Sequence, residues 1–227
     1  MFWNEDKKTE KFEIPDDVVD VSFAIKCKCL PLEHMHALSE SLHDALPWLE
    51  EEKLAGIHPI YGAESGNGWV RPEDPNELLY FSRRQKMTLR LPKERLTEAD
   101  TLIGQTLSVA GYDLEIGKSS VKKLSDLPTN FCRSVMTEQS MGEDDFLNWA
   151  YAELKSLNIT VRKMMAGKER VVTLPHGEDL VTRSLMLAEL EQAESVRLQQ
   201  HGIGGGRKLG CGLFLPQKDI KAVNSDD

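Results

Sequence analysis

The chain has 227 residues, of which 40% are hydrophobic and 29% charged, and its formal net charge is −9. This length can form one large domain or two domains of about 100 residues each, and the composition is that of a folded rather than a disordered protein. No apolar run is long enough to span a membrane, and the acidic first twenty residues do not resemble a secretory signal. The four cysteines lack the spacing of a disulfide framework, so we expect a cytoplasmic protein with no membrane partner.

The first half of the chain predicts the order strand, helix, strand, strand, helix, strand. Residues 17–30 alternate apolar and polar side chains with a period of two, which indicates a half-buried strand. The apolar residues of 31–46 recur at helical spacing, and Pro47 predicts the end of that helix. The remaining elements expected here are a loop with a short strand at 57–76, a strand at 78–91, a helix at 92–104 and a strand pair or bent strand at 105–117.

The second half repeats this order after a polar connector at 118–129. Its expected elements are a strand at 130–137, a helix at 142–157 with Glu143 and Asp144 in its first turn, a hairpin of 159–165 and 169–174 about a turn at 166–168, a helix at 178–200 and a last strand at 211–216. Two such units in series are two ferredoxin-like domains, a topology that also occurs in RNA-recognition folds. We therefore predict an α+β fold with tandem ferredoxin-like domains at residues 15–120 and 128–216.

Basic residues gather locally despite the negative total charge. Residues 82–95 hold six basic side chains against Glu94, and residues 155–170 hold five against Glu169. Residues 196–210 hold three basic side chains and no acidic one. Local basic patches decide phosphate contact more than the total charge does. These runs are either solvated faces or contacts for a polyanion, and charge alone leaves both interpretations open.

The most unusual stretch is HGIGGGRKLGCGLF, residues 201–214, which contains six of the sixteen glycines and lies between the last predicted helix and the last strand. A P-loop would need Ser or Thr directly after Lys208, and a Rossmann fingerprint would need glycine in place of Arg207. The spacing that fits is G-Φ-G-x5-G-Φ-G, with Φ apolar, from Gly202 to Gly212. Paired glycines allow successive backbone N–H groups to face a phosphate, and the two basic residues add positive charge. The alternative is a tight helix-to-strand turn with a helix cap at Gly202.

With this loop in this position, the chain resembles the CRISPR repeat-processing endoribonucleases of the repeat-associated mysterious protein (RAMP) superfamily. Those proteins carry the loop between the last helix and the last strand of a second ferredoxin-like domain. The resemblance implies CRISPR repeat RNA as the partner, no metal and no other cofactor. It also implies cleavage by attack of a ribose 2′-OH on the adjacent phosphate, leaving a 5′-hydroxyl and a 2′,3′-cyclic phosphate, and a product that stays bound. Further subunits of a multi-protein CRISPR effector complex remain open as partners.

Histidine is the residue type that this reaction favours, since it can serve as base for the 2′-OH and as acid for the departing oxygen near neutral pH. The resemblance places a catalytic histidine on or just after the first helix, where this chain has His34, His36 and His43. We choose His43 first, because its context LSESLHDALPWL resembles the family's helix and because it lies in the last turn before Pro47. His36 is the second choice.

The residues predicted to contact RNA come from the glycine-rich loop and from the two longer basic runs. They are Gly202, Gly204, Gly205, Gly206, Arg207, Lys208, Gly210, Gly212, Arg162, Lys163, Arg83 and Arg84.

Three alternatives compete with this interpretation. A zinc site would use Cys27, Cys29, His34 and His36. Histidines two apart on a helix diverge by about 200°, and the cysteines continue the apolar alternation, so we predict no metal site. A two-histidine phosphoesterase needs two H-x-[ST] motifs, which the sequence lacks. The third alternative, a non-catalytic RNA-binding subunit of a CRISPR effector complex, stays open.

Overall fold

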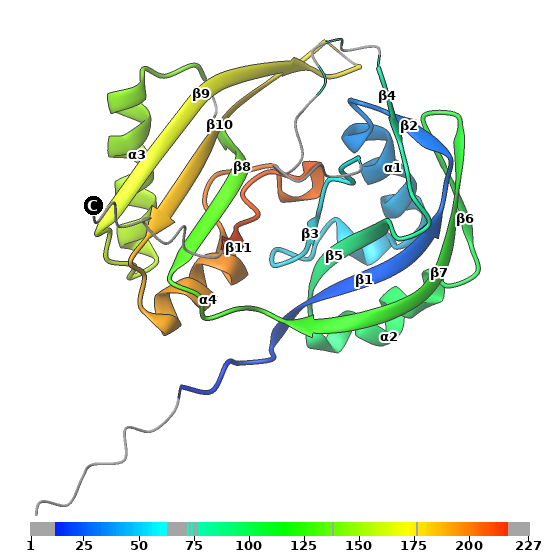
Figure 1. Ribbon diagram of the computed structural model, residues 1–227, viewed down its shortest axis with the longest axis horizontal. Helices are drawn as coiled ribbons and strands as arrows, with labels where there is room; N and C mark the ends of the chain where they lie inside the picture. Colours follow the sequence, from blue (N-terminus) through cyan, green and yellow to red (C-terminus); the bar gives the residue numbers. More distant parts are fainter. Residues whose placement is uncertain are drawn as a thin grey trace, which may run out of the picture.

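Two α+β units follow each other along the chain and lie side by side (Figure 1). The computed structural model describes residues 12–62, 72, 74, 77–137, 139–175 and 177–217. Each unit has one main antiparallel sheet, which confirms the predicted α+β class. Within this described part of the chain, no helix is long and apolar enough to cross a membrane.

The first unit is built on a five-stranded sheet of order β3-β5-β1-β7-β6. Its strands are β1 (Val18–Lys26), β3 (Gly56–Ile57), β5 (Lys86–Pro92), β6 (Thr106–Val109) and β7 (Tyr112–Lys123). Its helical elements are α1 (Met35–Ala45), α2 (Leu96–Ala99) and short 3-10 turns at Pro47–Leu49, Lys93–Arg95 and Asp100–Leu102. A separate ladder pairs β2 (Cys29–Pro31) with β4 (Leu78–Tyr80). Apart from β6, this strand order is the ferredoxin-like one.

The second unit is built on a four-stranded sheet of order β11-β8-β10-β9. Its strands are β8 (Thr129–Thr137), β9 (Lys163–Thr173), β10 (Asp179–Ala188) and β11 (Leu215–Gln217). Its helices are α3 (Glu143–Ser156) and α4 (Gln192–His201), followed by a 3-10 turn at Arg207–Leu209. The fourth strand pairs with the first, the first with the third and the third with the second, so the predicted second ferredoxin-like unit is confirmed.

The first unit follows the periodicity of its sequence. Val21 and Phe23 of β1 are buried against Leu38 and Leu42 of α1 in one apolar core. Because residues of a strand alternate between its two faces, the residues between them point to the other side of the sheet. Helix α1 ends where expected, since Pro47 follows its C-cap and has no N–H to continue the helical hydrogen bonds.

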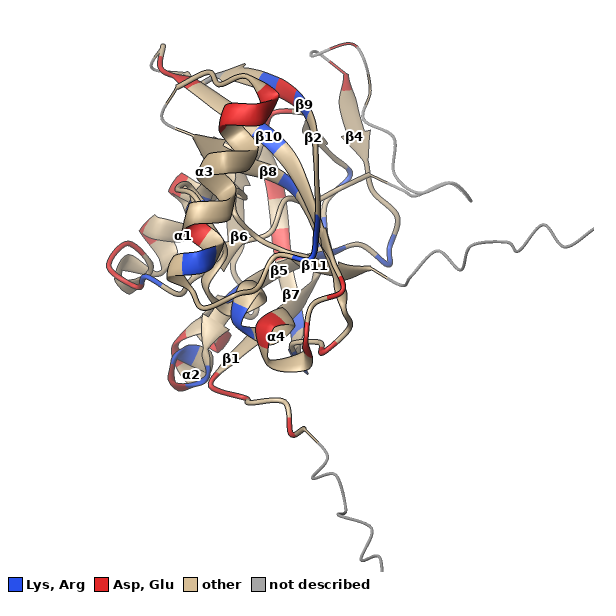
Figure 2. Cartoon of the chain, turned by 90° about the vertical axis from the view of Figure 1, so that its left-hand side faces the viewer, with Lys and Arg blue, Asp and Glu red and all other residues tan. Residues whose placement is uncertain are grey.

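Charge on α3 follows the helix dipole, as Figure 2 shows. Its first turn carries Glu143, Asp144 and Asp145, and its last turn carries Lys155. Acidic groups stabilise the positive N-terminal end of a helix and basic groups its negative end. The predicted first turn of this helix is therefore confirmed.

The largest errors of the sequence-based prediction lie in β9 and β10. The hairpin predicted about 166–168 is wrong, because β9 runs through that turn as one strand. The helix predicted at 178–200 is wrong in its first half, because β10 occupies 179–188 and α4 begins only at Gln192. A register shift between Arg183 and Leu185 is the physical reason. It changes which residues point inward halfway along β10, so the strand loses the alternation by which it could be recognised.

Smaller differences concern the limits of elements. The strand predicted at 78–91 is divided into β4 and β5, and β7 extends to Lys123, into the predicted connector at 118–129. The helix predicted at 92–104 consists of α2 with a 3-10 turn on either side. Most of the loop predicted at 57–76 lies outside the described residues.

A buried arginine joins the two units. The side chain of Arg90 on β5 is fully buried and binds both carboxylate oxygens of Asp20 at 2.8 and 2.9 Å. Its Nη1 donates to the carbonyl oxygens of Gln199 at 2.8 Å and Phe214 at 3.0 Å in the second unit. Burial alone would raise the pKa of the Asp20 carboxyl, but the charge of Arg90, the polar contact with His58 and the hydrogen bonds of Arg90 together outweigh it and hold that pKa well below its usual range.

Candidate RNA-binding cleft

A cleft of about 440 Å³ lies between the two units. One wall is formed by residues 32–36 and 59–61 of the first unit, and the other by β8, β9 and β10. Residues 209–211 of the glycine-rich loop complete the lining. A concave surface where two units meet, with a few polar groups converging on it, is where ligands bind most often in proteins.

Of the two histidines predicted as catalytic, the structure brings only His36 to this cleft. His36 lies in the first turn of α1, lines the cleft and keeps 22% of its side chain exposed, and its Nδ1 lies 3.2 Å from Oε2 of Glu40. His43 lies about 10 Å farther along the helix and does not line the cleft. Its Nδ1 donates to the carbonyl oxygen of Ser39 at 2.7 Å instead.

His34 also lines the cleft, but both nitrogens of its ring are engaged. Nδ1 lies 3.0 Å from the carbonyl oxygen of Pro31, and Nε2 accepts a hydrogen bond from the backbone N–H of Ile60 at 3.2 Å. This pattern requires the neutral ring with its proton on Nδ1. His34 therefore fixes the chain at the entrance to α1. Among the described residues, no group of three or more His, Cys, Asp or Glu side chains could hold a metal ion.

Sequence reasoning missed the residues that the second sheet contributes to the cleft. The guanidinium of Arg133 on β8 lies 4.9 Å from the ring centre of Tyr61 and 5.9 Å from that of Phe131. Burial raises the pKa of Tyr61 to about 12, so its hydroxyl stays protonated at neutral pH. The alternation of strand 130–137 could have shown that Phe131 and Arg133 share a face opposite Cys132, but not that this face meets the first unit.

A second arginine of the cleft is paired across the two units. Arg170 on β9 lines the cleft and donates to Oε1 of Glu33 at 2.6 Å. Both side chains are more than one-third exposed, so the pair contributes little to stability. Arg170 lies within the basic run at 155–170, of which only Arg162 and Lys163 are predicted from the sequence to contact RNA.

The glycine-rich loop lies in the middle of the molecule between the two units (Figure 1, orange to red). Five of its glycines have positive φ angles: Gly202, Gly204, Gly206, Gly210 and Gly212. A Cβ atom at Gly202 would collide with the carbonyl oxygen of Gly212, and one at Gly210 would lie 2.7 Å from Pro59. These glycines therefore leave room for other parts of the protein's own chain to pack against the loop backbone.

The buried amides of the loop are also used internally. The N–H groups of Gly202, Gly210 and Gly212 donate to the carbonyl oxygens of Leu198, Arg207 and Ser134. These three glycines are buried, whereas Gly205 is exposed. The expectation that their N–H groups face a phosphate is therefore wrong for Gly202, Gly210 and Gly212. The helix cap at Gly202, the alternative interpretation, is what the structure shows.

The two basic residues of the loop bind backbone carbonyls. Arg207 donates to the carbonyl oxygens of Leu54 and Ala55 in the first unit and to those of Gln200 and His201 at the end of α4. Burial, together with the charge of Arg90, lowers the pKa of Arg207 to about 10. Lys208 donates to the carbonyl oxygen of Glu52 at 2.6 Å. Both side chains hold the loop to the first unit, and their geometry does not support the predicted phosphate contacts.

The remaining predicted RNA contacts lie in two places. Arg162 and Lys163 form ion pairs at the start of β9, the first with Glu191 and Glu194 and the second with Glu189. They lie about 23 Å along the strand from Arg170, which lines the cleft. Arg83 and Arg84 are exposed in the turn between β4 and β5, next to Gln85, whose side chain donates to the carbonyl oxygen of Tyr61 at 2.6 Å. Of these two pairs of basic residues, Arg83 and Arg84 thus lie in a turn that is connected to the lining of the cleft.

Comparisons with known proteins agree with this architecture. The family model described as "Cas6 Crispr" matches residues 19–219. The chain is 32% identical over 207 residues to the CRISPR-associated endonuclease Cas6 of Myxococcus xanthus (strain DK1622), covering 91% of this chain and 85% of that protein.

Solved structures show the same fold at low sequence identity. One described as "CRISPR associated protein Cas6" has a TM-score of 0.61 at 10% identity, covering 88% of this chain and 100% of that chain. Another, described as "An RAMP protein binding different RNA substrates", has a TM-score of 0.57 at 11% identity, with the same coverage of 88% and 100%. A Cas6-related protein from Pyrococcus furiosus has a TM-score of 0.54 at 10% identity, covering 87% of this chain and 97% of that chain.

Proposed function

The chain belongs to the Cas6 family, and we propose that it is an endoribonuclease that cleaves precursor CRISPR RNA within its repeats to give guide RNAs. The proposed reaction is metal-independent: a ribose 2′-OH attacks the adjacent phosphate, the bond to the 5′ oxygen breaks, and the products carry a 2′,3′-cyclic phosphate and a 5′-hydroxyl. The observation that carries the proposal is that a cleft between the two units contains both His36 and Arg133. The relative from Myxococcus xanthus is named an endonuclease, which supports the same conclusion.

His36 is the proton-transfer group that we propose. Nδ1 lies beside Oε2 of Glu40, and we propose that Nε2, the other ring nitrogen, takes the proton of the 2′-OH. His43 was the first choice from the sequence, but its Nδ1 is used within α1 and its ring does not line the cleft. The charge that develops on the phosphate oxygens would be stabilised by Arg133 and Arg170, since positive groups fixed in advance favour such a transition state.

The first experiment is cleavage of a labelled repeat RNA in EDTA by the unmodified protein, His36→Ala and His43→Ala. We expect His36→Ala to lower the cleavage rate about 10²- to 10⁴-fold, the usual contribution of a proton-transfer group. His43→Ala is the matched control, a histidine on the same helix outside the cleft, and should cut at nearly the normal rate. The 2′,3′-cyclic phosphate is checked by its resistance to a phosphatase until acid opens the ring.

Three other results would each change the proposal. Loss of activity in His43→Ala alone would restore the first choice made from the sequence. Equal activity of all three proteins would remove both histidines from the reaction. Tight binding without any cleavage, even by the unmodified protein, would favour the remaining alternative, an RNA-binding subunit that does not cut.

We also propose that the cleaved repeat stays bound. Only the contacts at the broken bond change during cleavage, so a surface that holds the rest of the repeat keeps its affinity. Size-exclusion chromatography after complete cleavage should show the product RNA eluting with the protein. Elution of free product would show release after each cut.

A further inference from the structure

A row of four apolar side chains crosses the second sheet on one face. Leu215 of β11 pairs with Phe131 of β8, Phe131 with Met186 of β10, and Met186 with Met165 of β9. Directly paired residues of neighbouring antiparallel strands have their side chains on the same face, about 5 Å apart. We call these four residues the apolar row.

This face is the one that the helices leave uncovered. The neighbours of the row along each strand, Phe214, Cys132, Leu185, Leu187 and Met164, pack into the core with α3 and α4. Successive residues of a strand point to opposite faces, so the row points away from the helices. Met165 is 59% exposed, and the other three side chains are half-buried.

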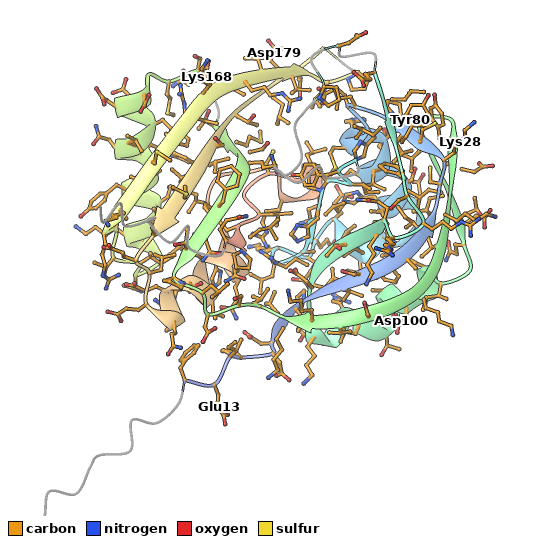
Figure 3. The ribbon with its side chains drawn as sticks, in the orientation of Figure 1. Glu13, Lys28, Tyr80, Asp100, Lys168 and Asp179 are labelled. Atoms are coloured by element: carbon orange, nitrogen blue, oxygen red, sulfur yellow. The ribbon has the colours of Figure 1, made fainter. Side chains whose placement is uncertain are left out.

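The row is continuous with the cleft at Phe131, which lines it together with Arg133. The Arg133 guanidinium lies over the rings of Phe131 and Tyr61, so a positive group adjoins the aromatic end of the row. Next to Arg133 this face carries Ser184, which lines the cleft, and Gly167, whose Cβ would collide with the Ser184 Oγ. Farther along the same face the cleft lining is mixed, with Arg170 and Thr182 beside the apolar Val172 and Leu180. The charged Lys168 lies at the outer edge of the second unit (Figure 3).

We propose that this face binds unpaired nucleotides of the RNA, with a base stacked on Phe131 and its phosphate on Arg133. An aromatic ring on the first strand of a ferredoxin-like sheet, next to a cation, can hold an unstacked base in this way. A docked protein would need about 800 Å² of surface, more than a row one residue wide offers. The inference deepens the proposed function, on which it rests: it adds a subsite for single-stranded RNA beside the cleft.

The test measures binding of a labelled, unstructured 12-nucleotide RNA in EDTA by fluorescence anisotropy. Phe131→Leu, which keeps an apolar side chain but loses the ring, should weaken binding about 5- to 150-fold, the range expected for loss of one base–aromatic stack. Phe131→Tyr, which keeps the ring, should bind within about twofold of the unmodified protein. The matched control is Tyr151→Leu, an aromatic residue 49% exposed on α3, which should bind normally.

The salt dependence separates stacking from charge. Phe131→Leu should leave the slope of log affinity against log salt unchanged, because it removes no phosphate contact. Unchanged RNA affinity of Phe131→Leu would overturn the subsite. Equal weakening of binding by Phe131→Leu and Phe131→Tyr would overturn it as well. A dimer that becomes a monomer in Phe131→Leu, with RNA affinity unchanged, would assign the face to a protein contact instead.

Cleavage of the repeat RNA is read in the same preparations, so that the two proposals can fail separately. If the unmodified protein cuts but Phe131→Leu binds normally, the subsite is wrong and the nuclease stands. If the unmodified protein does not cut but binding depends on the ring of Phe131, the subsite stands and the nuclease falls.

Discussion

The glycine-rich loop has an unusual sequence but serves the fold, whereas the open face of the second sheet has an ordinary sequence but reaches the cleft. The loop is the most unusual stretch of the sequence, yet its buried amides donate within the protein and Arg207 binds four backbone carbonyls. The sheet face has an ordinary strand sequence, yet Phe131 and Arg133 reach the cleft from it. A run of glycines marks a backbone that must bend tightly and be closely approached, and here the approaching group is the protein's own chain.

The largest effect expected from this difference is on stability. Gly202→Ala should lower the free energy of unfolding by at least ~2 kcal/mol, because the residue has a φ of 61° and its Cβ would collide with the backbone at Gly212. Gly205→Ala should change it by less than ~0.5 kcal/mol, since Gly205 has no positive φ and the nearest atom to its Cβ would be Sδ of Met136 at 3.5 Å. Urea unfolding of both variants measures the difference.

Measuring RNA binding by Gly202→Ala and Gly205→Ala shows whether the glycines serve the fold or contact RNA. If Gly202→Ala is as stable as the unmodified protein but loses RNA affinity, the loop contacts RNA, and the conclusion that its glycines serve only the fold is wrong. If the stability falls and the folded fraction still binds normally, the glycines serve the fold.

Much of the first unit could be predicted because its physical signals are local. Strand β1 alternates from Val19 to its end, and α1 ends before a proline. Strand β10 could not be recognised, because the register shift after Arg183 interrupts its alternation. A bulge depends on the pairing with neighbouring strands, which no single segment of sequence contains.

The candidate site was predicted as a region but not as a set of side chains. The family resemblance predicted a catalytic histidine on the first helix, and one of the two candidates, His36, lines the cleft. Helical spacing tells which residues share a side of α1, but not which end of that helix faces the second unit. Arg133 and Tyr61 come together only through packing of the two units, so their contact has no sequence signal.

A smaller expected effect is the change of stability with pH that comes from the buried His58. The ring of His58 is buried. Its Nε2 lies 3.4 Å from Oδ1 of Asp20, but this nitrogen makes no hydrogen bond among the described residues. Burial, with the charges of Arg90 and Arg207, lowers the pKa of His58, and Asp20 opposes this only in part.

Because the folded state keeps His58 neutral, the unfolded state binds the extra proton below pH 6.5, and stability falls as pH falls from there toward the folded pKa. This group can remove at most about 1.4 kcal/mol between pH 7.5 and 5.5. His58→Gln cannot titrate, so urea unfolding of this variant should show a smaller loss over that interval. An identical loss in both proteins would mean that His58 takes up its proton equally in the folded state.

The smallest expected effect is on RNA affinity, and it compares Arg133, which lines the cleft, with Arg162, which lies outside it. Arg133→Gln should weaken binding of the repeat RNA three- to tenfold and reduce the salt slope by about 0.7, the value for one phosphate contact on a single strand. Arg162→Gln should leave both unchanged, because Arg162 already donates to Glu191 and Glu194 at 2.8 and 2.6 Å. Its loss should instead destabilise the fold, since Glu194 is nearly buried and would lose its cationic partner.

The pair is matched in charge, and both arginines lie on or beside strands of the same sheet, so only position distinguishes them. If Arg162→Gln flattens the salt slope as much as Arg133→Gln does, the basic run at 155–170 grips RNA as the sequence predicted. The ion pairs of Arg162 must then open during binding. If only Arg133→Gln flattens it, a cation binds phosphate where the fold brings it to the cleft, and the density of basic residues along the chain does not decide the RNA contact.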